Sequence, residues 1–178
     1  AAGNFPASAL SMSANAFKTV VDIDLMGTFH VLKLAFPRLR KPGACIINVS
    51  APQAAIPMPL QMHVCAAKSG VDMITRVSAL EWASAGVRVN SIVPGPIADT
   101  EGMARLAPTP DAARQVAQSI PLGRYGRKQE IADACLWLAS PMASYVTGVV
   151  LPIDGGWSLG GASLSMTGLM QYSSNPAT

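Results

Sequence analysis

The chain has 178 residues, half of them hydrophobic, so it holds enough apolar material for the core of one domain. Its 13 lysines and arginines stand against 10 acidic residues and are scattered along the sequence, which argues against a nucleic-acid partner. The three cysteines, Cys45, Cys65 and Cys135, lie far apart in apolar runs without a metal-ligand pattern, so we expect free thiols and no metal site.

Two uncharged stretches, residues 42–67 and 134–153, are long enough to cross a bilayer. Prolines such as Pro57 in the first and Pro141 in the second interrupt them, so we expect no membrane span. The opening AAGNFPAS lacks a basic region followed by an apolar run, and the final NPAT is not a peroxisomal address. A cytoplasmic location is therefore expected.

Helix-like and strand-like segments alternate along the chain. In chain order we expect a helix, a strand, a helix, a strand, a polar stretch with one short helix, a helix and a strand, at residues 13–40, 43–50, 61–85, 87–94, 101–127, 128–139 and 148–153. Ser13 is a plausible N-cap of the first helix, and Gly86 ends the second long one. Because helices alternate with buried strands, the sequence predicts an α/β fold with parallel strands.

A nucleotide-binding sheet of this type begins with a strand, a Gly-rich turn and a helix that holds the pyrophosphate. No G-x-G-x-x-G occurs in the chain. The phosphate cradle is therefore not expected within these residues.

A series of stretches resembles motifs of the short-chain dehydrogenase/reductase family, in order and at that family's distances: AAG (1–3), DLMGTF (24–29), IINVSA (46–51), Lys68, RVNSIVPGPIADT (88–100) and ASYVTGVVLPIDGG (143–156). The resemblance implies that residues 1–156 are the C-terminal two-thirds of one Rossmann-like, doubly wound parallel sheet whose first βαβ units are absent, followed by a tail at 157–178. The chain is then either a fragment, the interpretation we favour, or a shortened protein.

Two departures from the family pattern bear on the chemistry. The family places a serine seventeen residues before the lysine and a tyrosine four before it, where this chain has Ala51 and Val64. Ser50 is expected on the opposite side of its strand, in a hydrogen bond within the sheet. Carbonyl reduction needs an acid beside the carbon that receives hydride, so it is disfavoured, whereas conjugate reduction carries the charge to a distant oxygen.

The match narrows over AAGNF, LQMHVCAAKSGVDMITR and PGPIADTEGMARL, which resemble the 2,4-dienoyl-CoA reductase branch, particularly its peroxisomal-type members. That branch lacks the same serine and tyrosine. The resemblance implies reduction of 2,4-dienoyl-CoA thioesters from unsaturated fatty acids with NADP(H), NAD(H) being less expected. Two alternatives stay open: a short-chain reductase of another activated substrate, and a truncated, non-catalytic domain acting as an interaction module.

Four residues are predicted for catalysis by this resemblance. Lys68 would hold the nicotinamide ribose hydroxyls, and Asp24 would pair with Lys68 or order a proton-donating water. Asp72 lies one helical turn after Lys68, where it would position the same water or form a simple i, i+4 ion pair. Asp154 would face the site, although a turn at Asp-Gly-Gly explains it equally.

The same resemblance implies which residues bind the cofactor and which bind the substrate. Those expected to bind the cofactor are Gly3, Lys68, Pro94, Gly95, Ile97 and Thr100. Those expected at the acyl-CoA mouth are Phe5, Ser13, Asn15 and Arg105. Ser13 also suits an N-cap and Arg105 a solvated helix face. His63 is either part of the site lining or a packing residue.

A homo-oligomer is expected by analogy with the family, whose two long helices commonly form dimers and tetramers. The small residues expected on that surface are Ala66, Ala67, Gly70, Ala79 and Ala83.

Overall fold

The computed structural model describes residues 4–160. Its strands are β1 (Cys45–Val49), β2 (Arg88–Pro94) and β3 (Val150–Ile153). Its α-helices are α1 (Ala14–Val21), α2 (Gly27–Ala35), α3 (Met62–Trp82), α4 (Glu101–Leu106), α5 (Pro110–Ser119) and α6 (Lys128–Ala139). The expected α/β class is confirmed, and the stretch before α6 contains two short helices, α4 and α5, where one was expected.

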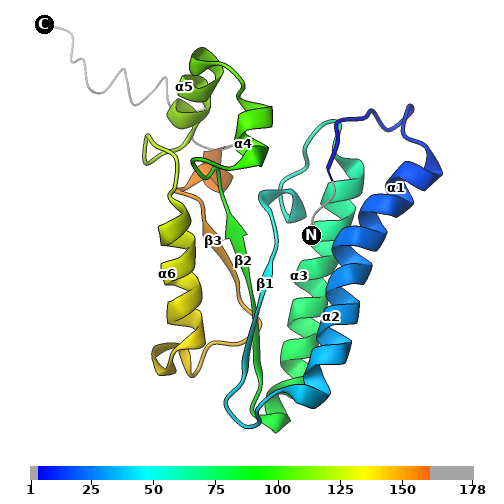
Figure 1. Ribbon diagram of the computed structural model, residues 1–178, viewed down its shortest axis with the longest axis vertical. Coiled ribbons are helices and arrows are strands. Elements are labelled where there is room, and N and C mark those ends of the chain that lie inside the picture. The colour runs from blue at the N-terminus through cyan, green and yellow to red at the C-terminus, as the bar shows by residue number, and fades with distance from the viewer. Residues whose placement is uncertain (1–3, 161–178) are drawn as a thin grey trace, which may run out of the picture.

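The three strands form one parallel sheet in the order β1-β2-β3. Cys45 pairs with Arg88 at the start of β1, and Ser91 pairs with Val150 where β3 joins. Helices α1, α2 and α3 lie on one side of the sheet and α6 on the other, while α4 and α5 lie beyond the carboxyl ends of the strands (Figure 1). Those carboxyl ends are the edge where ligands bind in open α/β sheets.

The first helical run begins where the sequence predicts, because the Oγ of Ser13 accepts a hydrogen bond from the backbone N–H of Ala16 at 3.1 Å. Between α1 and α2, residues Asp22–Met26 form a π-helical segment. The wider turn shifts the register of the residues that follow it, and such segments are frequent at functional sites. Asp24 lies in this segment and is almost fully buried.

The second long helix, α3, packs between the sheet and the first helical run. Helix α3 ends at Trp82 and continues as a 3₁₀ turn, Ala83–Ala85. That turn ends at Gly86, where the sequence predicts the stop, and its φ of 71° is a left-handed conformation that favours glycine. Beneath the last turns of α3, Ala79 joins Val87 and Val89 in the core, with Trp82 packed against them. Apolar contacts thus join the last turns of α3 to the amino end of the sheet, whereas the predicted site lies at the carboxyl end of the strands.

Three of the five small residues expected to face a second copy are packed inside the chain instead. Ala67 and Ala79 are buried inside the chain itself, and a Cβ on Gly70 would lie 2.8 Å from the side chain of Leu25. The exposed face of α3 carries larger apolar side chains, namely Met62, Met73, Val77 and Leu80. Ala67, Gly70 and Ala79 therefore serve contacts within the chain, whereas Ala66 and Ala83 are exposed.

No helix among residues 4–160 is both long and apolar enough to span a bilayer.

Candidate active site

Lys68 projects from the sheet-facing side of α3 toward the carboxyl end of β1. Its Nζ lies 3.4 Å from the carboxylate of Asp24 and 3.4 Å from the backbone carbonyl oxygen of Val49. The residue is 8 % exposed. An ammonium group has three donors, so a buried lysine in this setting can also hold a ligand hydroxyl.

Asp24 reaches Lys68 because the π-helical segment turns it toward α3. Its side chain is 1 % exposed, against 11 % for that of Lys68, so the pair is largely removed from water. Coulomb attraction is stronger there than at the surface, and it keeps the lysine in one place. The predicted contact between Asp24 and Lys68 is present, and its catalytic role stays a prediction.

Asp72 lies one turn after Lys68 but is held by a different partner. The hydroxyl of Ser91, on β2, donates a hydrogen bond to the Asp72 carboxylate at 3.2 Å, and both residues are buried. No ion pair joins Asp72 to Lys68 among residues 4–160, so the simple i, i+4 pair considered from the sequence is not formed. Sequence spacing gave no sign of Ser91, because this contact depends on how α3 lies across β2.

The positions of the missing hydroxyls are filled by small or apolar side chains. Val64 is buried on α3, one turn before Lys68, and Ala51 follows β1. The backbone N–H of Ser50 donates to the carbonyl of Ile92 at 2.9 Å, but its Oγ has no hydrogen-bond partner within the described part of the chain. The side-chain hydrogen bond expected for Ser50 is therefore not found there.

Asp154 ends β3 and serves the turn that follows it. Its carboxylate accepts hydrogen bonds from the backbone N–H groups of Gly156 at 2.9 Å and Ser158 at 2.8 Å. Partial burial acts to raise the pKa of Asp154, but the bonds from Ser158 and Gly156 outweigh it and leave that pKa below its ordinary value. This is the turn-forming alternative, and no contact with Lys68 accompanies it in the described residues.

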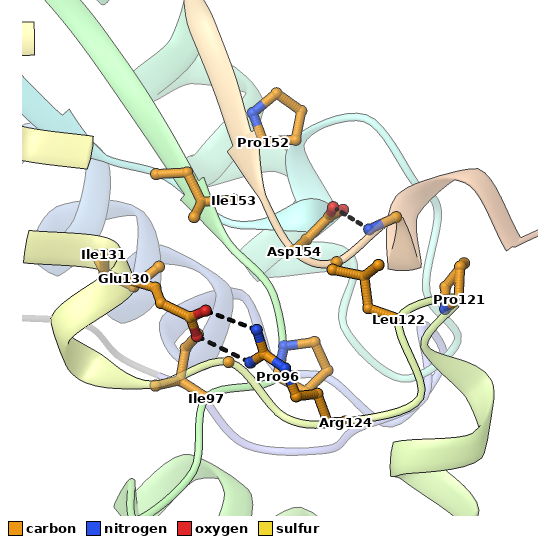
Figure 2. A pocket seen from close by; sticks show the side chains of 13 residues that line it. Pro96, Ile97, Pro121, Leu122, Arg124, Glu130, Ile131, Pro152, Ile153 and Asp154 are labelled. Carbon is orange, nitrogen blue, oxygen red and sulfur yellow. Dashed lines mark hydrogen bonds and ion pairs between the residues drawn. The ribbon is translucent and has the colours of Figure 1, made fainter. Parts of the chain in front are cut away.

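A cavity of about 520 Å³ opens where β2 and β3 end. Figure 2 shows Ile97, Leu122 and Asp154 around it, with the Arg124 guanidinium paired to the Glu130 carboxylate at one wall. Arg124 donates to both oxygens of Glu130, at 2.7 and 3.0 Å, and its hydrogen bond lowers the pKa of Glu130 to about 2. This pair was not predicted from the sequence.

The predicted cofactor loop is built around local contacts. A Cβ on Gly95 would lie 2.6 Å from the Cα and Cβ of Asp154, so glycine is required where the ends of β2 and β3 meet. The Thr100 side chain caps α4 by accepting from the N–H of Met103 and donates to the Ile97 carbonyl. Ile97 lines the cavity and Pro94 ends β2. Gly3 lies outside the described residues.

The structure therefore brings Lys68 and Asp24 together as an ion pair. Ile97 and Asp154 lie together at a different place, in the lining of the cavity. Neither Lys68 nor Asp24 lines the cavity at the end of β3. The four predicted catalytic residues thus fall into three local settings within the described part of the chain.

The predicted substrate residues are at the surface. Phe5 packs on His63, Ser13 caps α1, and the backbone carbonyl of Asn15 accepts a bond from Thr19. Arg105 is exposed and pairs with Glu101 on the same helix, as expected for a solvated face. Their roles toward a substrate stay predictions.

Comparisons with known proteins place the chain in a family. A family model described as enoyl-(acyl carrier protein) reductase matches residues 1–158. The peroxisomal 2,4-dienoyl-CoA reductase of Rattus norvegicus is 47 % identical over 157 residues, which cover 88 % of this chain and 54 % of that protein. The corresponding enzyme of Saccharomyces cerevisiae is 45 % identical over 161 residues, 90 % of this chain and 55 % of its own length.

A solved structure agrees with these sequence relatives. A gluconate 5-dehydrogenase from Burkholderia cenocepacia, in complex with NADP and tartrate, aligns with a TM-score of 0.79 and 26 % identity over 89 % of this chain and 62 % of that one. The chain spans about half the length of the curated relatives it matches. Its three parallel strands correspond to the C-terminal part of the Rossmann-like sheet, and the chain belongs to the short-chain dehydrogenase/reductase family of oxidoreductases.

Proposed function

We propose that the protein to which these residues belong reduces 2,4-dienoyl-CoA thioesters with NADPH. The observation that carries the proposal is the buried Lys68–Asp24 pair combined with Val64 and Ala51 at the positions of the family's two hydroxyls. This arrangement keeps a fixed positive charge and provides no phenol to protonate a ketone. The dienoyl-CoA reductases at 45 to 47 % identity support the same substrate class.

The chemistry of a dienoyl thioester suits such a site. NADPH, when bound, supplies a hydride, which adds to C5 of the 2,4-diene. The C4–C5 π electrons shift toward C3, and those of the C2–C3 bond pass to the thioester oxygen. A proton then reaches C2, which leaves a single double bond between C3 and C4. That product is the one in the printed names of both relatives, which are called (3E)-enoyl-CoA-producing.

The chain's own groups have distinct parts in this proposal. Lys68 donates to ribose hydroxyls of the cofactor, and Asp24 holds the ammonium in place across 3.4 Å. The positive charge of the Lys68 ammonium stabilises the negative charge that develops on the substrate. Asp72, fixed by Ser91, is proposed to orient the water that delivers the proton to C2. The Asp72 carboxylate is buried, so a water bound to it would exchange slowly with solvent.

The assay that tests the function uses the longest product of the gene, NADPH and 2,4-hexadienoyl-CoA, with absorbance at 340 nm as the readout. We expect NADPH oxidation that depends on the dienoyl thioester and is far slower with simple ketones and with enoyl-CoA. Lys68→Met should lower the rate by about 100-fold or more, as expected for loss of a fixed charge in a buried site. Lys18→Met, at an exposed lysine on α1, is the matched control and should leave the rate unchanged.

The opposite pattern would reject the function. Rapid reduction of ketones without any dienoyl-dependent oxidation of NADPH would favour the alternative of another activated substrate. No NADPH oxidation with any of these substrates, together with no NADPH binding by that longest product, would favour the interaction module.

A homo-oligomer belongs to the same proposal. Leu80 is 82 % exposed on α3, beside Val77 and Met73 on the same face, and a second copy would cover these side chains. Leu80→Glu should lower the mass measured by light scattering, whereas Leu10→Glu, at a fully exposed loop leucine, should not. The location stays a prediction, because the relatives are named as peroxisomal proteins while a cytoplasmic one was expected.

A further inference from the structure

His63, in the first turn of α3, is a buried polar residue that the proposed mechanism does not use. It is 0 % exposed, and neither ring nitrogen has a hydrogen-bond partner among residues 4–160. A neutral imidazole carries one donor and one acceptor, so two polar atoms are left unpaired. Each of them costs stability relative to an apolar side chain of similar shape.

One aromatic side chain packs directly on this imidazole. The ring of Phe5 lies edge-on to it, with centroids 4.4 Å apart and an interplanar angle of 61°. Phe5 belongs to the segment before α1, which has no helix or strand and is tied to the start of α3 by the bond from the Ala7 N–H to the Leu60 carbonyl at 3.0 Å. Phe5 is itself 36 % exposed. It therefore separates solvent from His63 without being locked in the core.

Packing alone does not account for histidine at this position. A leucine, whose side chain is close in size to that of histidine, would pack against Phe5 without unpaired nitrogens. Buried polar groups without partners are rare in folded proteins, and where they persist a partner in another functional state is a physical explanation. The unpaired nitrogens of His63 thus indicate a partner that arrives with a ligand.

We propose that His63 binds the amide-bearing arm of the acyl thioester after the Phe5 ring turns aside. A secondary amide has one N–H donor and one carbonyl acceptor, which match the acceptor and the donor of a neutral imidazole. The pantetheine arm of coenzyme A contains such amides next to the thioester. This inference rests on the proposed function for the identity of the thioester, and it adds a binding residue to that site.

The first test compares two thioesters of 2,4-hexadienoic acid in the longest gene product. The N-acetylcysteamine thioester contains the amide, and the S-pentyl thioester has a chain of similar length without it. His63→Phe keeps an aromatic ring against Phe5 and removes both nitrogens. We expect this variant to raise KM for the amide-bearing thioester roughly 5- to 20-fold, the loss of one or two neutral hydrogen bonds. The KM for the S-pentyl thioester and both kcat values should change less than about twofold, within the spread of a neutral packing change.

Thermal unfolding of the same variant separates binding from structure. His63→Phe should leave the melting temperature unchanged or raise it, because the unpaired nitrogens are gone. His30→Phe, at an exposed histidine on the neighbouring helix α2, is the matched control and should leave both KM values unchanged. A lower melting temperature, or equal KM changes for the two thioesters, would overturn the inference.

The second test does not require turnover. The chain has two histidines, so their imidazole NMR signals can be assigned by the two single variants. Saturating N-acetylcysteamine thioester should shift the ring signals of His63 and leave those of His30 in place. If the wild-type protein reduces no dienoyl thioester, the proposed function fails, while a shift of His63 would still support the binding site. Unchanged His63 signals at saturation would overturn it.

Discussion

Removing the charge of Asp24 tests the buried ion pair on which the site depends. Asp24→Asn keeps the size of the side chain and leaves the Lys68 ammonium without its counter-charge. Two unit charges 3.4 Å apart attract by about 5 kcal/mol at an effective dielectric constant of about 20. Part of that attraction is replaced by the amide oxygen of the introduced side chain and by the Val49 carbonyl, so we expect the free energy of unfolding at pH 7 to fall by about 3 kcal/mol.

Urea unfolding followed by tryptophan fluorescence measures this loss, since Trp82 packs on Phe36 in the core at 4.5 Å between ring centroids. The double variant Asp24→Asn with Lys68→Met removes both charges and should regain most of the loss, because no unpaired buried charge remains. Asp22→Asn breaks an exposed i, i+4 pair in the same helical run and should cost less than about 0.5 kcal/mol. A cost for Asp24→Asn no larger than this control, or a double variant no more stable than the single one, would refute the reasoning.

Three further outcomes can be measured. Glu130→Gln should be less stable than wild type at pH 7, and because the pKa of Glu130 is lowered from 4.5 to about 2, the difference in melting temperature should vanish as the pH falls through that interval. Gly95→Ala should cost about 1–3 kcal/mol in urea unfolding, since its Cβ would meet Asp154, whereas Gly102→Ala, with open space around it, should stabilise α4 by about 0.5–1 kcal/mol. Residues 1–178 alone should give no calorimetric signal of micromolar NADPH binding, because they contain no G-x-G-x-x-G.

The regular elements were predictable where glycine and proline mark their ends. Gly86 and the Pro94-Gly95-Pro96 run bounded the second strand to within one residue, and the apolar runs beside them identified parallel, buried strands. The π-helical segment at Asp22–Met26 was not predictable, because a single widened turn leaves too short a trace in a pattern of period 3.6. The division of residues 101–127 into α4 and α5 was missed although Thr109 and Pro110 supply an N-cap and a first-turn proline.

The part of the site that was predictable is the contact between two neighbouring helical segments. Asp24 and Lys68 were expected to meet from motif positions alone, and they do. Contacts that depend on the tilt of a helix across the sheet, such as Ser91 with Asp72, leave no sequence signal. The Arg124–Glu130 pair was missed even though Glu130 stands at the third position of α6, where a carboxylate caps the helix start.

Some residues that match the family's motifs have a structural role in this chain, and that role is enough to explain why they are present. Ser13 caps α1, Thr100 caps α4, Gly95 gives room to Asp154, and Asp154 closes the turn after β3. Each would be kept by selection for stability alone, so its presence adds little to the case for chemistry. A buried ammonium–carboxylate pair is different, because apolar residues of similar volume are often as stable or more stable. The Lys68–Asp24 pair is therefore the strongest indication of function among these residues. The stability of the double variant Asp24→Asn with Lys68→Met measures whether the fold itself needs the pair: if the double variant is as stable as wild type, stability does not explain why the pair is present.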